Sequence, residues 1–251
     1  MTARQVAALP DKDWAPLIVA TGAIEQHGPH LPVAVDSFLA QGWLQYIFSR
    51  MTPEVSAYAT LPITIGKSNE HVGFPGTLYI SKDTLREHLL VLARQARAWG
   101  FRQFIILNTH GGNSAVINYT LREIRATLGL RADFLRPSVR HDIPPLEAAY
   151  GFHANLVETA LMLAKAPQYT RHERAVCWYP GKLDEPGELR PEFAPATFSW
   201  ATQDISPSGI MGDAVSATAE QGRRWHEAQG AASVAAVAAL CAEGRRIAAA
   251  G

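Results

Sequence analysis

Two short apolar runs, each followed at once by polar residues, constrain the fold of this chain more than any other feature. Leu17 to Ala23 reads LIVATGA, and Phe104 to Asn108 reads FIILN. Runs of this length without polar alternation are typical of strands buried on both faces of a parallel sheet. Such sheets bind ligands beyond the carboxyl ends of their strands. The loops that follow these two runs are therefore the expected place for a functional site.

Segments with helical character lie between the extended runs. Ser81 to Trp99 is the strongest, because Ser81 can cap its start and Leu85 and Leu89 recur at helical spacing. The other expected elements are helices over Ser37 to Met51, Ser114 to Leu128 and Asn155 to Lys165, an extended run over Ser56 to Ile65 and a strand over Ala132 to Leu135. Strands that alternate with helices predict an α/β fold, a three-layer sandwich with a central, mostly parallel sheet.

The chain of 251 residues is long enough to bury a large core, and we expect residues 1–251 to form a single domain. Residues 178–213 are rich in Pro, Gly and Ser and lack periodicity, which predicts a long loop. That loop is either a surface excursion or a substrate lid or subunit contact. Residues 214–250 are rich in Ala and are expected to form a C-terminal helix.

Charge and cysteine content bear on partners and compartment. Lys plus Arg equals Asp plus Glu at 23 each, so the chain lacks the basic excess that nucleic acid or an anionic membrane usually requires. The N-terminus has no signal-peptide character, and no stretch approaches the roughly 18 apolar residues of a membrane span. Two distant cysteines, Cys177 and Cys241, fit an intracellular protein. We therefore expect a cytoplasmic protein with neither nucleic acid nor membrane as its partner.

The loop after the first apolar run is dense in metal-ligating side chains. Glu25, His27 and His30 lie in the segment GAIEQHGPHLP, and Asp36 follows four residues after its last Pro. A carboxylate and an imidazole two residues apart in an extended segment point to the same side. Nitrogen and carboxylate ligands suit Zn²⁺, Mn²⁺ or Fe²⁺, and Asp36 could bridge two ions. The alternative is a polar turn in which Asp36 caps the following helix.

The loop after the second run places His110 beside two glycines, in the segment NTHGGN. Gly111 and Gly112 allow close backbone approach and leave N–H groups free for an oxyanion, although a tight turn alone would also use them. Further along, Glu158 is either a metal ligand or second-shell base, or a favourable partner of a helix dipole.

The loop before the FPGT segment contains a further acid and imidazole. Glu70 and His71 could line a substrate pocket or form a solvated pair on a surface loop.

In combination these segments resemble the creatininase (creatinine amidohydrolase) family. The likeness extends from about Gly22 to Asp213. It rests on ordered motifs: GAIEQHGPHLP with Asp36, FPGT at Phe74 to Thr77, NTHGGNS from Asn108, HANLVETALML from His153 and GIMGD at Gly209 to Asp213.

The resemblance implies a set of roles. The positions of Glu25, His27, Asp36 and His110 bind one or two divalent metals in that family, commonly Zn, Mn or Fe, with the aspartate as the bridge. The position of His153 is implicated in proton transfer, and that of Glu158 lies at the metal site. Family members have a creatininase-like α/β fold and form homo-oligomers, often hexamers.

The implied activity is that of a metal-dependent amidohydrolase. Metal-bound hydroxide would attack the carbonyl of a small-molecule cyclic amide or formamide and cleave a non-peptide C–N bond, while His153 passes a proton to the leaving nitrogen. Two other readings use the same ligands: a metal-assisted lyase or isomerase that acts on a carbonyl substrate, and a non-catalytic metal-binding protein.

The chain departs from creatininase itself at two places. Gly112 stands where that enzyme has a metal-binding glutamate. Ala148, Ala149 and Tyr150 stand near its substrate-contacting tryptophans.

Overall fold

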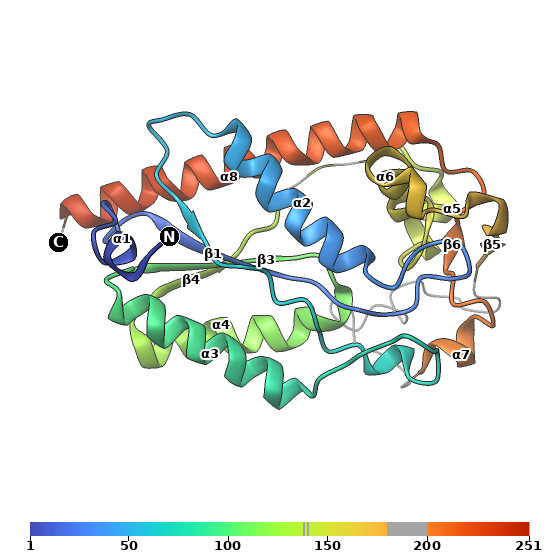
Figure 1. Ribbon diagram of the computed structural model, residues 1–251, viewed down its shortest axis with the longest axis horizontal. Coiled ribbons are helices and arrows are strands. Elements are labelled where there is room, and N and C mark those ends of the chain that lie inside the picture. The colour runs from blue at the N-terminus through green and yellow to red at the C-terminus, as the bar shows by residue number, and fades with distance from the viewer. Residues whose placement is uncertain (138, 140, 180–199, 251) are drawn as a thin grey trace.

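The computed structural model describes residues 1–137, 139, 141–179 and 200–250, and Figure 1 shows their arrangement. In chain order the elements are α1 (Ala3–Ala7), β1 (Pro16–Thr21), α2 (Val35–Arg50), β2 (Tyr58–Ala59), η1 (Asn69–His71), α3 (Lys82–Ala98), β3 (Gln103–Asn108), η2 (Gly111–Asn113), α4 (Ser114–Leu128), β4 (Arg131–Phe134), α5 (Pro145–Tyr150), α6 (Leu156–Lys165), η3 (Pro167–Tyr169), η4 (His172–Arg174), β5 (Cys177–Trp178), α7 (Thr202–Ile205), β6 (Gly212–Asp213) and α8 (Ala219–Ala250).

The central sheet has four parallel strands in the order β2-β1-β3-β4. The connection from β1 through α2 leads to β2 on one side, and the chain then crosses back through α3 to β3 on the other side of β1. The strand order therefore reverses between β1 and β3, where Thr21 is paired with Asn108. A crevice at such a point is where open α/β sheets bind ligands.

Helices cover both faces of the sheet, so the predicted three-layer sandwich is confirmed (Figure 1). Side chains alternate along the strands. Ile18 and Ile105 pack on one face, in a core shared with α2, α6 and α8. Val19 and Phe104 pack on the other face, against α3 and α4. Because both faces are covered, every residue of β1 is buried, which explains its unbroken apolar sequence.

The core is tight beneath the end of β3 that leads to His110. Phe104, Ile105 and Ile106 have no exposed surface. Truncation of a fully buried Ile to Ala typically costs about 2–5 kcal/mol. The strand that positions His110 is therefore firmly held by packing.

Most predicted elements are confirmed to within a few residues. The helix over Ser114–Leu128 has the predicted bounds. Ser81 caps α3, where its Oγ accepts the N–H of Thr84 at 3.0 Å. The expected run over Ser56 to Ile65 is wrong in extent, since β2 has two residues and Ile63 adds only an isolated bridge to Thr21. Pro62 lies between them and has no N–H to donate to a ladder.

The predicted long loop over residues 178–213 is only partly visible, because residues 180–199 lie outside the described residues. At its ends, β5 and β6 pair antiparallel, and α7 lies between. The predicted C-terminal helix begins at Ala219 rather than at residue 214. Asp213 Oδ1 accepts the N–H groups of Val215 and Ser216, at 3.1 Å each, and closes a turn before the helix starts. Over the described residues, no helix combines the length and apolar character that a bilayer crossing requires.

Candidate metal centre

Four of the predicted ligands meet at the carboxyl ends of β1 and β3. Glu25 and His27 follow β1, Asp36 lies in the first turn of α2, and His110 follows β3. Gly22 makes this meeting possible, because a Cβ there would lie 2.7 Å from the backbone of Ser37, the residue after Asp36. The alternative that Asp36 caps α2 is wrong, since the cap position is Ala34.

Two other sequence motifs hold the loop that contains Glu25. The backbone N–H of Gln26 donates to Thr77 Oγ1 of the FPGT segment at 3.1 Å. The Gln26 side-chain nitrogen donates to the carbonyl of Gly209, in the GIMGD segment, at 3.0 Å. Segments that are distant in the sequence therefore fix the backbone between Glu25 and His27.

We call Glu25, Asp36 and His110 the first group. His110 Nδ1 lies 3.2 Å from Glu25 Oε2 and 3.3 Å from Asp36 Oδ2. Each of the three residues is at most 4% exposed. Two carboxylate oxygens thus converge on one imidazole nitrogen in a site closed to bulk water.

The second group consists of His27, Asp36 and Glu158. His27 Nε2 lies 3.6 Å from Asp36 Oδ1 and 4.0 Å from Glu158 Oε1. Asp36 therefore faces a different histidine with each of its two oxygens. Glu158 comes from the first turn of α6, and its Oε2 accepts the N–H of Ala154 at 2.6 Å. Glu158 lies in the first turn of a helix and also faces His27, so its position is compatible with both alternatives for this residue.

Hydrogen bonding leaves the inward atoms of both groups suited to a cation. His27 Nδ1 lies 3.1 Å from the carbonyl of Glu25; donation of its proton there leaves Nε2 with a lone pair toward Asp36 and Glu158. Among the described residues, Glu25 Oε2, His27 Nε2 and Asp36 Oδ2 are buried without a hydrogen-bond partner. Buried polar atoms are rarely left unpaired in proteins. These atoms and the mixed nitrogen and oxygen donors fit Zn²⁺, Mn²⁺ or Fe²⁺.

Charge in the cluster shifts several pKa values. Burial would raise the pKa of Glu25, but the charge and hydrogen bonds of His110 and His71 hold it well below its usual range. Burial would lower the pKa of His27, but the neighbouring Asp36 raises it to about 10. Burial raises the pKa of Glu158 to about 7. Buried carboxylates in this number require compensating positive charge, which protonated histidines supply here and a divalent ion would supply in their place.

His153, the predicted proton carrier, lies between two other imidazoles. Its ring centroid is 4.5 Å from that of His27 and 4.2 Å from that of His71. Its Nε2 lies 2.7 Å from the carbonyl of Gln26, and its Nδ1 lies 3.5 Å from Glu25 Oε1. Burial, with the charges of His71 and His27, holds the pKa of His153 well below its ordinary value. A neutral imidazole with one free nitrogen can accept and return a proton.

A sharp turn places His153 and Glu158 together. Ala154 has a positive φ of 50°, an uncommon conformation for a residue with a side chain. Asn155 then caps α6, where its side-chain oxygen accepts N–H groups from Val157 and Glu158 at 3.1 Å each. The turn and the cap direct the start of α6 toward the sheet loops.

His30 of the GAIEQHGPHLP segment lies outside both groups. Its Nε2 contacts Thr159 Oγ1 on α6 at 2.8 Å. Burial lowers the pKa of His30 to about 4, so it is neutral at pH 7. His30 therefore connects the loop after β1 to α6.

Glu70 and His71 lie next to the predicted metal ligands, whereas the sequence alternatives placed them in a substrate pocket or on a solvated surface loop. His71 is 3% exposed, so a solvated loop pair is wrong, and its Nε2 lies 3.4 Å from Glu25 Oε1. Glu70 Oε1 lies 3.4 Å from His110 Nε2. The described residues include four overlapping groups of three side chains whose ligand atoms lie within 4.8 Å of one another, and both residues belong to such groups. The only sequence signal for them was an acid and an imidazole ahead of FPGT.

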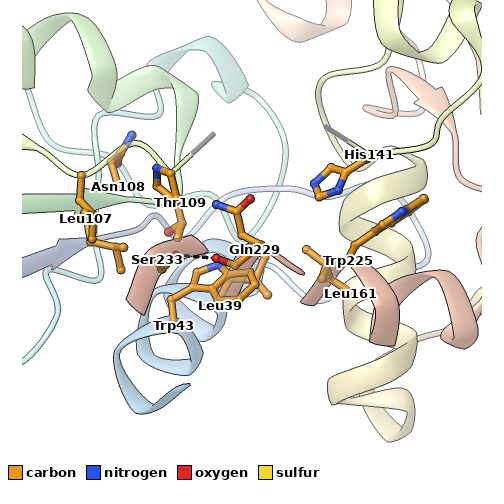
Figure 2. Close-up of a pocket in the computed structure, with 12 residues that line it drawn as sticks. Leu39, Trp43, Leu107, Asn108, Thr109, His141, Leu161, Trp225, Gln229 and Ser233 are labelled. Atoms are coloured by element: carbon orange, nitrogen blue, oxygen red, sulfur yellow. Dashed lines mark hydrogen bonds between the residues drawn. The ribbon is translucent and has the colours of Figure 1, made fainter. Parts of the chain in front are cut away.

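A cavity of about 200 Å³ lies between α2, α8 and the end of β3 (Figure 2). Its wall contains Trp43, Trp225 and Thr109 but none of the predicted metal ligands. Thr109 Oγ1 donates to the carbonyl of Asp36 at 2.8 Å, which connects this wall to the cluster.

Comparison with known proteins identifies relatives of the chain. The family model for creatininase, described as creatinine amidohydrolase, matches residues 1–237. The mycofactocin precursor peptide peptidase of Mycobacterium ulcerans (strain Agy99) is 30% identical over 216 residues, which cover 84% of this chain and 80% of that protein. The creatinine amidohydrolase of Pseudomonas putida is 29% identical over 182 residues, or 64% and 68% of the two chains. A solved structure described as "Creatininase Mn" has a TM-score of 0.68 at 23% identity and covers 99% of this chain and 95% of its own.

Proposed function

This chain belongs to the creatininase family, and we propose that it is a metal-dependent amidohydrolase that cleaves a C–N bond with water. One observation carries the proposal: the two carboxylate oxygens of Asp36 face the histidines of two separate groups, and three atoms that face into these groups, Glu25 Oε2, His27 Nε2 and Asp36 Oδ2, are buried without a hydrogen-bond partner among the described residues. Asp36 would therefore help to hold a divalent ion in each group.

We assign Glu25, Asp36 and His110 to one divalent ion and His27, Asp36 and Glu158 to another. The manganese in the description of the similar creatininase structure supports a transition metal at this place. Zn, Mn and Fe all suit the donors. Bound there, a divalent ion would lower the pKa of a water molecule toward about 7 and would polarise the substrate carbonyl.

The protein groups supply the remaining chemistry. His153 Nδ1 faces the cluster, and we assign it the transfer of a proton to the leaving nitrogen, because an unprotonated amide nitrogen is a poor leaving group. The N–H groups of Gly111 and Gly112 are our candidates for contact with the developing oxyanion. The closed, buried surroundings of the first group limit competing water.

We propose a small cyclic amide or a formamide as the substrate. The similarity to the mycofactocin precursor peptide peptidase, which covers 80% of that protein, favours a peptide C–N bond as the second candidate for the bond that is cleaved. We further propose that residues 1–251 act as one domain, in a cytoplasmic homo-oligomer that can be a hexamer. Light scattering or native mass spectrometry tests the assembly.

The first experiment is metal analysis of protein purified without chelator. The wild type should contain one or two equivalents of Zn, Mn or Fe, and a Glu25→Ala, His110→Ala variant should lose the ion that the first group holds. The matched control is Glu87→Ala, His88→Ala, which removes the same residue types from an exposed part of α3. A wild type that takes up no metal even after reconstitution would refute the proposal.

Product mass distinguishes the reaction classes. A hydrolase adds one water molecule to the sum of its products, whereas a lyase or isomerase conserves the mass of its substrate. Metal-loaded protein that converts neither cyclic amides, formamides nor peptides would favour a non-catalytic metal-binding role.

A further inference from the structure

His110 has two faces, and only one of them is turned toward the other predicted ligands. Its Nδ1 faces Glu25 and Asp36. Its Nε2 faces a loop ahead of FPGT, where it lies 3.1 Å from the carbonyl of Lys67, 3.2 Å from Ser68 Oγ and 3.4 Å from Glu70 Oε1. A histidine that binds a metal through one nitrogen donates from the other, and the partner fixes both its tautomer and its orientation.

Glu70 can reach His110 because residue 112 has no side chain. A Cβ built on Gly112 would overlap Glu70 Oε1 and would come within 2.5 Å of His110 Nε2. The carboxylate of Glu70 and any side chain at position 112 therefore exclude each other. The φ of Gly112 lies outside the left-handed region, so space rather than backbone conformation requires glycine here.

Contacts on all sides fix Glu70 in this position. Its other oxygen, Oε2, accepts from Lys67 Nζ at 3.0 Å. Its backbone carbonyl accepts from Thr202 Oγ1 at 2.9 Å, and the start of the loop is held by Asn113 Oδ1, which accepts the N–H of Lys67 at 2.9 Å. The side chain is 15% exposed, so its interaction with His110 is largely shielded from water.

We propose that Glu70 is a positioning residue, which holds His110 from behind through Nε2–H in the space that glycine at position 112 leaves open. This inference rests on the proposed metal centre. The carboxylate selects the tautomer with a lone pair on Nδ1, which is the nitrogen that faces Glu25 and Asp36. In this proposal Glu70 acts through His110, because its Oε1 lies beside Nε2 whereas Glu25 and Asp36 lie beside Nδ1. The missing side chain at position 112 is thus compensated by an acid from a different loop.

The test is the dissociation constant of Zn²⁺, measured by competition with a chromogenic chelator on metal-free full-length protein. We expect Glu70→Ala to weaken binding about 10–100-fold, the usual cost of removing a partner of a metal-binding histidine, with the number of bound ions unchanged. Glu70→Gln should lie between Glu70→Ala and the wild type, because an amide oxygen still accepts from Nε2–H. Glu87→Ala is the control, since it removes an exposed carboxylate that also pairs with a cation, Arg94.

Gly112→Ala provides an independent second variant. Its methyl group should displace Glu70 and also press on His110 Nε2 and on the Lys67 carbonyl, so it should weaken Zn²⁺ binding at least as much as Glu70→Ala does. The double variant Glu70→Ala, Gly112→Ala should then bind no more weakly than the weaker single variant, since residues that act through one contact are not additive. Thermal unfolding of the metal-free proteins separates this effect from general destabilisation, because loss of the contact should weaken the binding constant far more than it shifts the midpoint.

The outcomes separate this inference from the proposed function. If the wild type binds Zn²⁺ and Glu70→Ala binds it equally well, the positioning role is wrong and the metal centre stands. If Glu70→Ala loses one whole equivalent of zinc, Glu70 is itself a ligand and the positioning role is again wrong. If the wild type binds none of Zn²⁺, Mn²⁺ and Fe²⁺, the proposed function fails and this inference fails with it.

Discussion

The site is built from two halves that the chain positions in different ways. The sheet half comprises Glu25, His27, Asp36 and His110, on loops that follow the adjacent strands β1 and β3. The helix half comprises His153 and Glu158, at the start of α6. Side chains of the sheet half are at most 4% exposed, whereas the Glu158 side chain is 21% exposed.

The core of the molecule fixes the sheet half more firmly than the helix half. The sheet half is held by six register pairs between β1 and β3 and by a sheet that is covered on both faces. The helix half depends on the positive φ of Ala154, on the helix cap Asn155, and on the contact between His30 and Thr159. We therefore expect the sheet half to retain metal by itself and the helix half to control the second ion and the proton transfer.

The largest effect should come from Asp36→Ala, because Asp36 belongs to both groups. Both ions should be lost, and turnover should fall by roughly 10³-fold or more, since without a metal the pKa of water stays far above neutral pH. Metal analysis of the purified variant measures the loss of the ions, and a turnover assay measures the loss of activity. Asp83→Ala, an exposed first-turn aspartate of α3, is the control. Full retention of one ion in Asp36→Ala would show that the residue is not shared.

His153→Ala separates chemistry from metal binding within the helix half. The turnover number should fall by about 10²–10⁴-fold, the usual contribution of a general acid or base, while metal content stays near that of the wild type. His88→Ala, on the exposed face of α3, should leave both unchanged. Parallel losses of metal and turnover in His153→Ala would instead identify His153 as a ligand.

Glu158→Ala and His110→Ala should each remove one ion, but not the same one. Glu158→Ala should leave the first group filled, because its members come only from the sheet half. Metal titration of each variant, followed by calorimetry, measures how many ions it still binds. The control is Glu220→Ala, an exposed glutamate in the first turn of α8, which shares only the favourable helix-dipole interaction of about 0.3–1 kcal/mol. Equal metal content in Glu158→Ala and the wild type would leave Glu158 as a helix-dipole partner.

The two groups should respond differently to pH. The pKa of His27 is raised to about 10 and that of Glu158 to about 7, so below pH 7 an ion must displace two protons from the second group. In the first group, the pKa of His110 is raised well above its ordinary value but that of Glu25 is held well below, so one proton is displaced. Below pH 7 the affinity should therefore fall by about 100-fold per pH unit in the second group and by about tenfold in the first. Binding isotherms measured between about pH 5.5 and about pH 7, the range below the pKa of Glu158, give the two slopes. Equal slopes would show that the two groups release the same number of protons, which would contradict this prediction.

The sequence predicted the sheet half well because its residues follow recognisable strands. The apolar runs LIVATGA and FIILN mark β1 and β3, and parallel pairing brings their ends together. Caps such as Ser81 are equally local, and α3 begins where predicted. The extent of β2 was not predictable in the same way, because Pro62 interrupts an otherwise favourable β pattern.

Two residues that no local pattern places at the site lie in the short helix η1, within the connection between β2 and α3. Glu70 and His71 reach His110 and Glu25 from positions about 40 residues away in the sequence, because the preceding backbone is anchored on Asn113. The role of Gly112 is visible only when the carboxylate that fills its space is known.

The α/β alternation, the capped start of α3 at Ser81 and the ligand-rich ends of two strands could be predicted from the sequence, since these features depend on residues that are near neighbours in the chain. The tertiary structure decided which loops close around those ends and how α6 approaches them. These arrangements depend on contacts such as the one between His30 and Thr159, which are 129 positions apart. A local sequence pattern cannot predict such a contact, because the contact depends on the path of the whole chain between the two residues.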